Sequence, residues 1–260
     1  MKHIIKFFLR NIPRKYLQRI VKMAVTMIKP LYLGNKVKCP VCGKHYRKFL
    51  PYGYVNARPN ALCPNCLSLE RHRLLWMYFQ QTDILKSNKS FLHIAPEICF
   101  INRLKKTNLY YKTADLESPW ADLHFNIENI PLADESFDFI MANHILEHVE
   151  HLDKALSELY RILKPHGQAI LLSPVNRNLP HTYEDASITN PLEREKAFGQ
   201  KDHVRMFGLD YAQVLAQSGF SVEENSEFIN QFSKKEIYKF GFGEINKLGI
   251  EQHIFIGHKK

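Results

Sequence analysis

Short apolar runs alternate with segments of helical period from residue 90 to the end of the chain. The apolar runs predict buried strands at 90–95, 109–115, 123–127, 137–143 and 168–174, with two more at 220–224 and 253–260. In the segments between them, apolar residues recur every three to four positions, which predicts helices at 98–106, 151–164 and 209–219. Strands that alternate with helices indicate a parallel sheet with crossover helices on both faces. We therefore expect an α/β fold for this part of the chain.

Residues 1–30 follow a different pattern, that of a basic amphipathic helix. Basic residues interrupt every apolar run, so neither a signal peptide nor a helix that spans a bilayer is predicted. After Pro13, one helical face is basic and polar and the other is apolar. The polar face carries Arg14, Lys15, Gln18, Arg19, Lys22 and Thr26, and the apolar face carries Leu17, Ile20, Val21, Ala24, Met27 and Ile28. This pattern favours either docking on an anionic membrane surface or packing on the rest of the protein, and nucleic-acid contact ranks below both.

Charge divides the chain at Glu70. The 260 residues carry a formal net charge of +10, yet residues 1–69 contain 14 Lys and Arg and no acid. The remainder holds 22 bases against 26 acids, a net charge of −4. An apolar fraction of 45% with 12% aromatic residues excludes a disordered chain. The composition thus indicates a basic front joined to a mildly acidic globular body.

Four of the five cysteines form two Cys-x-x-Cys pairs separated by 20 residues. They are Cys39, Cys42, Cys63 and Cys66. Each pair can present two thiolates to one tetrahedral ion, and the spacing is typical of a zinc ribbon. A redox site is the alternative, but it would use a single pair at the start of a helix. We expect a closed structural Zn²⁺ site in residues 31–68, followed directly by a helix over 68–81 with Ser68 as its N-cap.

Two long blocks in the body carry a family resemblance. "IPLADESFDFIMANHILEHV" and "ELYRILKPHGQAILLSP" resemble the middle of class I S-adenosylmethionine-dependent methyltransferases. "HIAPE", "YYKTADLES" and "FGQKDHVRMFG", preceded by the double Cys-x-x-Cys, resemble more narrowly a bacterial group of these enzymes associated with cell-surface glycan biosynthesis. The resemblance implies a Rossmann-like methyltransferase domain over 69–260, S-adenosylmethionine as cofactor and a cytoplasmic protein.

The first strand is followed by an altered cofactor turn. The family has an acid and two glycines there, whereas this chain has His93, Ala95, Pro96 and Glu97 around Ile94. Ala95 is small enough to replace a glycine, but Pro96 removes one amide donor. From its charge, we expect Glu97 to bind the ammonium group of the cofactor. The alternative is a turn that no longer binds cofactor.

Three polar residues follow the next strands. Asp115 ends the second strand, 22 residues after His93, where an acid accepts hydrogen bonds from ribose hydroxyls in nucleotide-binding α/β folds. Asn126 occupies the position where the resemblance implies an acid that binds the adenine amine, and an amide oxygen can accept the same bond. Asn143 ends the fourth strand and is expected to face the transferred methyl group.

Histidines on the substrate side are the candidate general bases. His144 and His148 are four residues apart, which would place them on one face of a helical turn. His144 is the candidate base, and packing is the favoured role of His148. The polar segment 176–207 resembles a substrate lid, within which Asp202, His203 and Arg205 are the substrate-side candidates. A solvated loop is the alternative for this segment.

Three functions are consistent with these features. The first is a methyltransferase for a small-molecule or glycan acceptor, acting by O-methylation and docked by residues 1–30 at the inner membrane face. The second is a methyltransferase for ribosomal RNA or another nucleic acid, which the basic front favours but the sequence after the fourth strand does not. The third is a non-catalytic, zinc-stabilised binding protein.

Overall fold

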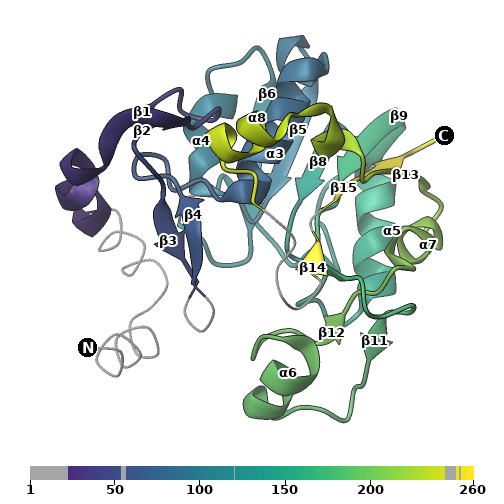
Figure 1. Ribbon diagram of the computed structural model, residues 1–260. Coiled ribbons are helices and arrows are strands. Elements are labelled where there is room, and N and C mark those ends of the chain that lie inside the picture. Colours follow the sequence, from purple (N-terminus) through teal and green to yellow (C-terminus); the bar gives the residue numbers. More distant parts are fainter. Residues whose placement is uncertain (1–22, 54–56, 120, 244–249, 252) are drawn as a thin grey trace. The chain divides into compact units, whose positions relative to one another are not determined.

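The computed structural model describes residues 23–53, 57–119, 121–243, 250–251 and 253–260 (Figure 1). The chain divides into two compact units. The first comprises residues up to Tyr78 together with Ile98–Phe100 and Phe232–Gly243, and the second comprises the rest. Most of the predicted helix over 1–30 lies outside the described residues. Among the described residues, no helix is both long enough and apolar enough to cross a bilayer.

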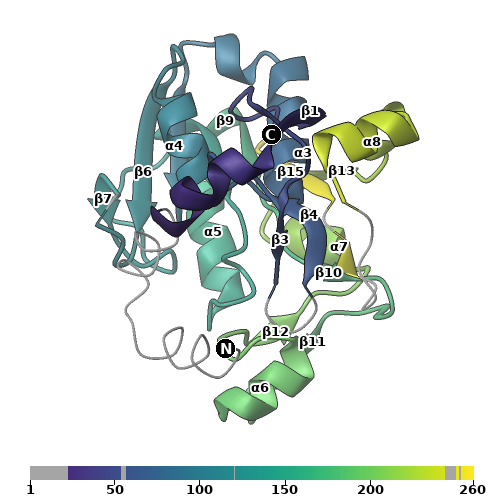
Figure 2. The ribbon, with the colours of Figure 1, turned by 60° about the vertical axis from the view of Figure 1, so that its left-hand side comes forward.

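A seven-stranded sheet forms the centre of the second unit. Its strands are β5 (Ser90–Ile94), β6 (Tyr110–Asp115), β7 (Leu123–His124), β8 (Phe137–Ala142), β9 (Leu163–Ile170), β13 (Ser221–Asn225) and β15 (Ile254–His258). The spatial order is β13-β15-β9-β8-β5-β6-β7, and Figure 2 shows β6 beside β7. The pairs among β5 to β9 are parallel, whereas β15 is antiparallel to both of its neighbours. This sheet confirms the predicted α/β class.

The strand order reverses at β5, and this reversal marks the part of the sheet where a ligand is expected to bind. The chain moves outward from β5 to β6 and β7, then returns to β8 on the other side of β5. Ile94 pairs with Ala114 of β6 and with Ala142 of β8, so the next residue of each strand reaches the same edge. Those residues are Ala95, Asp115 and Asn143. Ligands of open α/β sheets bind at this carboxyl edge, beside the point of reversal.

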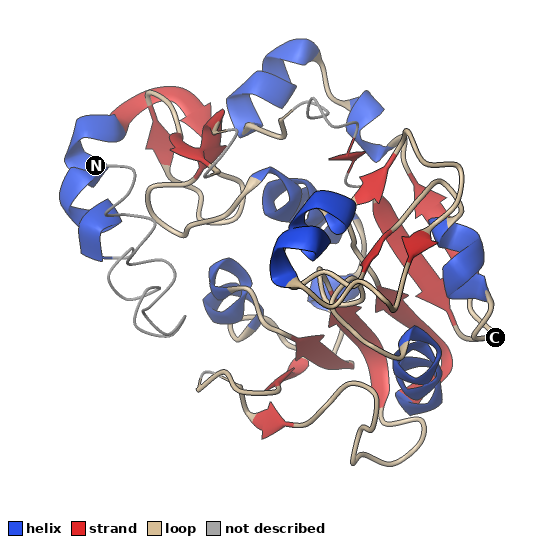
Figure 3. Ribbon diagram, turned by 90° about the horizontal axis from the view of Figure 1, so that it is seen from below, coloured by secondary structure: helices blue, strands red, loops and turns tan. Residues whose placement is uncertain are grey.

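Helices cover the sheet and bury a continuous core (Figure 3). The helices of the second unit include α5 (Leu152–Ile162), α6 (Pro191–Phe198) and α7 (Tyr211–Ala216). Leu152–Ile162 packs on β9 through an apolar stripe, and α7 packs on β13 and β15. The core includes Leu92, Ile140, Leu146, Leu156, Leu159, Leu171, Phe207, Tyr211 and Phe255. The short elements η2 (Ile84–Lys86), β10 (Val175–Asn176), β11 (Tyr183–Glu184), β12 (Arg205–Met206), η3 (Phe228–Gln231) and β14 (Ile250–Glu251) complete this unit.

Several predicted boundaries are wrong. The helix predicted to run to residue 164 ends at Ile162, and β9 begins at once instead of at residue 168. Pro165 and Gly167 lie inside this strand, in the stretch between Leu163 and Gln168 where the register between β8 and β9 shifts. The third strand is also shorter than predicted and ends at His124. The apolar pattern therefore located these elements but not their ends.

Asp138 ties three neighbouring strands together. Its Oδ2 accepts hydrogen bonds from the Ser90 amide (2.9 Å) and hydroxyl (2.6 Å) of β5 and from Lys164 Nζ (2.9 Å) of β9. Burial opposes the charged form, but these donors lower the pKa of Asp138 to about 2.

We expect Asp138→Asn to remove a pH-dependent part of the stability. The folded pKa lies below the unfolded one, so the stabilisation is complete above about pH 4 and disappears as the pH falls towards 2. After allowance for solvent screening, the contribution is about 1 kcal/mol. Urea unfolding at pH 7 and pH 3 measures it, with Asp83→Asn, an exposed acid, as the control. Equal losses for both variants at pH 7 would contradict this account.

In its described residues, the first unit contains two small antiparallel sheets and several helical segments. Its elements are η1 (Lys29–Tyr32), β1 (Leu33–Lys38), β2 (His45–Tyr46), β3 (Leu50–Tyr52), β4 (Arg58–Leu62) and α8 (Lys234–Phe240), with the start of α3 (Glu70–Gln81) and of α4 (Ile98–Leu104). The first sheet pairs β1 with β2, and the second pairs β3 with β4. One cysteine pair follows β1, and the other follows β4.

Arg73 joins these elements from inside the unit. Its side chain is fully buried and donates to the carbonyls of Ala61 (2.8 Å), Ser68 (2.7 Å) and Phe240 (2.8 Å), and also to that of Gly241. A guanidinium can satisfy this many acceptors because its donors are fixed in one plane. The C-terminus of α8 also favours a nearby positive charge.

Gly241 is required where α8 ends. Its φ is +62°, and an added Cβ would lie 2.6 Å from Phe49 Cε2 and 3.1 Å from Arg73 Nη2. We expect Gly241→Ala to lower the free energy of unfolding by about 2–4 kcal/mol, since it adds overpacking to a left-handed backbone. Gly43→Ala is the control, because Gly43 has φ +72° and no atom within 4 Å of the added Cβ. Denaturant unfolding of both variants separates the two costs, and equal losses would contradict the predicted clash.

Candidate functional site

The carboxyl edge of β5 carries a hydrogen-bonded set of polar side chains. His93 is fully buried, and its Nδ1 lies 2.8 Å from the hydroxyl of Tyr111. Its Nε2 contacts the carboxylate of Glu97, whose other oxygen accepts from Asn143 Nδ2 at 3.1 Å. Asn143 in turn accepts from the amide of Leu172 at 3.3 Å. The structure thus brings together three of the predicted cofactor residues, His93, Glu97 and Asn143.

Glu97 is held at the edge by its neighbours. Both of its carboxylate oxygens already have a partner from the protein, and the side chain is 15% exposed. A carboxylate has about four acceptor positions, so it retains capacity for an ammonium group. Tyr111 is a member of this set that the sequence analysis missed. Its position in β6, opposite Phe91 of β5, is visible only once the strands are paired.

The turn after β5 keeps a glycine-like backbone without a glycine. Ala95 has φ +47°, the left-handed region in which glycine carries no penalty. Its amide donates to Ala114 of β6 at 2.8 Å, so the turn remains attached to the sheet. Pro96 follows and offers no amide donor. The backbone conformation of this turn therefore allows a ligand to approach closely, although Ala95 stands where the related enzymes have a glycine.

Asp115 ends β6 with one carboxylate oxygen engaged. Its Oδ1 accepts from the amides of Glu117 (2.9 Å) and Ser118 (2.8 Å), which fixes the side chain at the edge of the sheet. Within the described part of the chain, no hydrogen bond to Oδ2 is found. Asp115 is half-buried, so Oδ2 can accept from ribose hydroxyls.

Asn126 accepts its hydrogen bond within a local turn, and not from the polar side chains at the end of β5. Its Oδ1 accepts from the amide of Glu128 at 3.0 Å, and the residue is exposed. The oxygen expected to bind an adenine amine therefore stabilises a local turn. An amide oxygen has a second lone pair, so the predicted role is compatible with this turn.

The segment after β8 is a turn, so the expected helical stacking of His144 and His148 is wrong. His144 has φ +53°, and its amide donates to Leu172 O at 2.6 Å. Glu147, three residues on, is 2% exposed and lies 3.3 Å from His144 Nδ1. Burial alone would raise the pKa of Glu147, but the hydrogen bond and charge of His144 lower it to about 2. A buried, ionised carboxylate thus lies directly behind the candidate base.

His148 and His203 meet across 55 positions of sequence. Their rings lie edge to face with centroids 4.7 Å apart. His148 Nδ1 is 3.0 Å from the carbonyl of Asp202, and His203 Nδ1 is 3.0 Å from that of Phe198. His203 is 3% exposed, and burial lowers its pKa. The structure therefore joins one predicted catalytic histidine, His203, to a histidine that the sequence analysis assigned to packing.

Arg205 is not free to meet a substrate, which corrects its predicted role. The side chain is fully buried and forms a two-bond ion pair with Glu184 at 2.9 and 3.0 Å. It also donates to the carbonyls of Leu146 and Val149 at 2.6 and 2.5 Å. These bonds fix the segment 144–149 against β12. Asp202, in contrast, has an exposed carboxylate.

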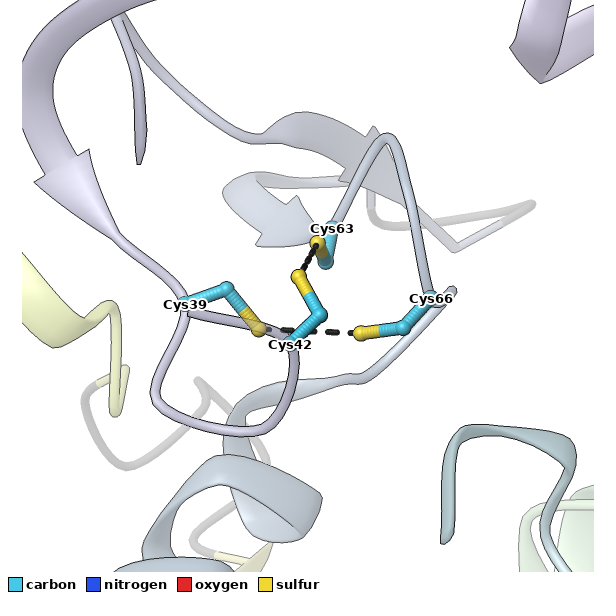
Figure 4. A group of neighbouring side chains, drawn as sticks. All are labelled: Cys39, Cys42, Cys63 and Cys66. Carbon is cyan, nitrogen blue, oxygen red and sulfur yellow. Dashed lines mark hydrogen bonds between the residues drawn. The ribbon is translucent and has the colours of Figure 1, made fainter. Parts of the chain in front are cut away.

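The four paired cysteines converge in the first unit (Figure 4). Cys39 Sγ lies 3.6 Å from Cys66 Sγ, and Cys42 Sγ lies 3.7 Å from Cys63 Sγ. All four sulfur atoms lie within 4.8 Å of one another, and none forms a disulfide. In a tetrahedral zinc site with bonds of about 2.3 Å, sulfur atoms stand roughly 3.8 Å apart. The cluster is therefore compatible with a zinc-ribbon-like module.

The backbone adopts a similar conformation in the two cysteine loops. The residue after each second cysteine has a positive φ, +72° at Gly43 and +61° at Leu67. Ser68 is not an N-cap, since α3 begins at Glu70 and the Ser68 hydroxyl lies 3.2 Å from Cys39 Sγ and 3.3 Å from Cys66 Sγ. Ser68 therefore supports the sulfur cluster instead of the helix.

Comparisons with known proteins agree on a methyltransferase domain. Residues 102–171 match the family model described as "Methyltransferase domain". A ubiquinone/menaquinone biosynthesis C-methyltransferase UbiE of Bartonella bacilliformis is 33% identical over 98 residues, 37% of this chain and 33% of that protein. The protein of the same name from Brucella abortus is 44% identical over 55 residues, 21% of this chain and 20% of that protein. The chain thus spans about a third or less of these relatives' length.

A solved structure matches the fold over a larger part of the chain. The cyclase SpnF superposes with a TM-score of 0.50 at 15% identity and covers 72% of this chain and 80% of its own. At this identity the likeness concerns the fold alone. The second unit therefore has a Rossmann-like fold, and residues 102–171 within it match a methyltransferase domain.

Proposed function

We propose that this protein transfers a methyl group from S-adenosylmethionine to a hydroxyl of a small-molecule or glycan acceptor. The observation that carries this proposal is the row of polar groups at the switch point of the sheet. Asp115, Glu97 and Asn143 follow three neighbouring parallel strands and reach the same edge. The glycine-like backbone at Ala95 leaves that edge open to close approach.

Each of these residues has a distinct task in the proposal. Asp115 accepts the ribose hydroxyls through its open oxygen, and Glu97 binds the ammonium group while Asn143 keeps it oriented. Asn126 is assigned to the adenine amine. The cofactor supplies a methyl group on a sulfonium, which is a good leaving group. Most of the remaining task of the protein is to hold the acceptor in line with that methyl group.

His144 is the proposed base on the acceptor side. It follows Asn143 directly, and Glu147 fixes its ring from behind. A base is needed for a hydroxyl acceptor, because the oxygen must lose its proton. The relatives named above are C-methyltransferases, and an acceptor carbon is the competing outcome for this chain.

The sulfur cluster of the first unit is proposed to hold a structural Zn²⁺ ion through Cys39, Cys42, Cys63 and Cys66. Sulfur distances of 3.6 and 3.7 Å support this assignment. A site of four thiolates carries excess negative charge, and the buried guanidinium of Arg73 interacts favourably with Cys39 and Cys63. With four protein ligands the site has no open position for chemistry.

We further propose peripheral contact with the inner face of an anionic membrane and a cytoplasmic location. The charge pattern of residues 1–30 supports it. Within the described part, Met23, Met27 and Leu31 are each more than 60% exposed. Flotation of the full chain with vesicles that contain phosphatidylserine tests this. If Met27→Glu and Leu31→Glu do not change the flotation, this surface does not contact the membrane.

Calorimetry with S-adenosylmethionine tests the proposed function. We expect one cofactor per chain with a micromolar dissociation constant. An absence of heat, with the protein folded, would favour the non-catalytic alternative instead.

A parallel pull-down with ribosomal RNA over a salt series tests the nucleic-acid alternative. Affinity that falls steeply with salt would favour that alternative, because phosphate contacts release counterions.

A further inference from the structure

Glu147, His148 and His203 form a second cluster of potential metal ligands. Each offers one donor atom, and these atoms all lie within 4.8 Å of one another. The three come from the turn after β8 and the segment before β12, and all belong to the second unit. Donor atoms around one ion, with bonds of about 2.1 Å, stand roughly 3–3.5 Å apart. Donor atoms within 4.8 Å of one another can therefore reach a common ion through adjustment of the side chains.

The tautomers of both histidines are set for metal binding. A carbonyl oxygen can only accept, so the 3.0 Å contacts with Asp202 O and Phe198 O place the protons of His148 and His203 on Nδ1. The lone pair of each ring is then on Nε2. Histidines that bind metals commonly donate their other N–H to a backbone carbonyl or a carboxylate in this way.

His203 Nε2 is an acceptor without a partner in the described part of the chain. The residue is 3% exposed, so bulk water does not satisfy this atom. Buried polar atoms nearly always have a partner, so an orphan nitrogen of this kind indicates a bound water or ion. His148, only 4.7 Å away between ring centroids, is part-exposed and leaves one side of the cluster accessible.

The third ligand is also held by a supporting shell. Glu147 Oε2 accepts from the Ser173 hydroxyl at 3.0 Å, and Tyr211 donates to Ser173 at 3.3 Å. The other carboxylate oxygen lies 3.3 Å from His144 Nδ1. Bound carboxylates are typically hydrogen-bonded by such outer residues. Ser173 and Tyr211 have no part in the proposed binding of S-adenosylmethionine or in the proposed proton transfer.

We propose that Glu147, His148 and His203 bind a divalent transition-metal ion whose open positions take an oxygen of the acceptor. Two imidazoles and one carboxylate favour manganese, iron, cobalt or zinc over magnesium or calcium, which prefer all-oxygen sites. Three protein ligands leave positions open, unlike the closed site of four cysteines.

The role of this ion rests on the proposed methyl transfer, whereas its binding does not. An acceptor hydroxyl beside a divalent cation loses its proton more readily, and the proton passes to His144, the proposed base. Its oxygen then forms the new bond to the methyl carbon, while the methyl–sulfur bond breaks and its electron pair stays on sulfur. The cluster therefore points to an acceptor with a free hydroxyl, or with two neighbouring ones.

Titration of the full chain with Mn²⁺, followed by electron paramagnetic resonance of the free ion, tests the site. Mn²⁺ is chosen because thiolate sites prefer softer ions, so the cysteine cluster keeps its zinc. We expect one saturable Mn²⁺ per chain in the unchanged protein. His203→Asn retains an N–H donor for Phe198 O but lacks Nε2, and it should abolish binding without loss of fold. Ser173→Ala should weaken binding by about 10–100-fold.

Two further variants keep the test decisive. His148→Asn, at a part-exposed position, should also abolish binding, and His181→Gln, at a side chain that is 84% exposed, should leave it unchanged. The proposal is overturned if both asparagine variants bind Mn²⁺ as tightly as the unchanged protein does. It is also overturned if the unchanged protein shows no saturable Mn²⁺ binding. Calorimetry with S-adenosylmethionine on the same unchanged protein separates the two ideas. Cofactor binding without Mn²⁺ binding rejects only the metal site, and the reverse rejects only the methyltransferase activity.

Discussion

Replacing Cys63 by serine is expected to abolish zinc binding and unfold the first unit. Cys63 is fully buried, and its sulfur lies 3.7 Å from that of Cys42. A hydroxyl is a poor zinc ligand, so the remaining three thiolates would form a weaker, open site. Structural zinc contributes about 10 kcal/mol or more to the folding of small modules, which is comparable to the whole stability of an ordinary domain.

The effect should be confined to the sulfur cluster. Cys99→Ala is the matched control, because Cys99 is a buried cysteine of the same unit outside the cluster. We expect one zinc per chain in the unchanged protein and in this control, and none in the Cys63 variant, by elemental analysis of gel-filtered protein. Limited proteolysis should then cleave the first unit of the Cys63 variant alone. A Cys63 variant that retains zinc and resists protease would refute the assignment.

Replacing Asp115 by asparagine is expected to weaken S-adenosylmethionine binding by about 10–100-fold, since hydrogen bonds to a charged acceptor are each worth about 1.5–3 kcal/mol. Asparagine keeps the oxygen that accepts from the amides of Glu117 and Ser118, so the turn after β6 should survive. The substitution replaces only the open oxygen, by an amide nitrogen that cannot accept. Calorimetry measures the dissociation constant of each protein.

Glu117→Gln is the control for this substitution. It removes an acid two residues away, in an exposed position, and leaves the Asp115 carboxylate in place. The cofactor affinity of this variant should match that of the unchanged protein. A similar loss in both variants would mean that the cofactor responds only to net charge near the edge of the sheet. No loss in the asparagine variant would remove Asp115 from the site.

Local pattern predicted the sheet and the positions at which polar residues leave it. Asp115 could be located because a buried strand that ends on an acid is a short-range signal, and the parallel pairing then brings it level with Asn143. The two cysteine pairs were equally readable, since their spacing within the sequence already limits what they can bind.

Long-range choices could not be read from the same pattern. Arg205 lies in a polar segment that was predicted to be a substrate lid or a loop. Its side chain is nevertheless buried, because it donates hydrogen bonds to the carbonyls of Leu146 and Val149, which are almost 60 residues away in the sequence. His148 meets His203 for the same reason. The start of β9 at Leu163 depends on its pairing with Phe137 of β8, which overrides the helical period of the preceding residues.

The central claim is that the carboxyl edge of β5, β6 and β8 binds S-adenosylmethionine. A crystal structure of the full chain with S-adenosylhomocysteine tests it most directly. We predict the ribose hydroxyls against the Asp115 carboxylate and the amino group against Glu97, with the sulfur near Asn143. A ligand bound elsewhere, or an edge without ligand at saturating concentration, would contradict the claim.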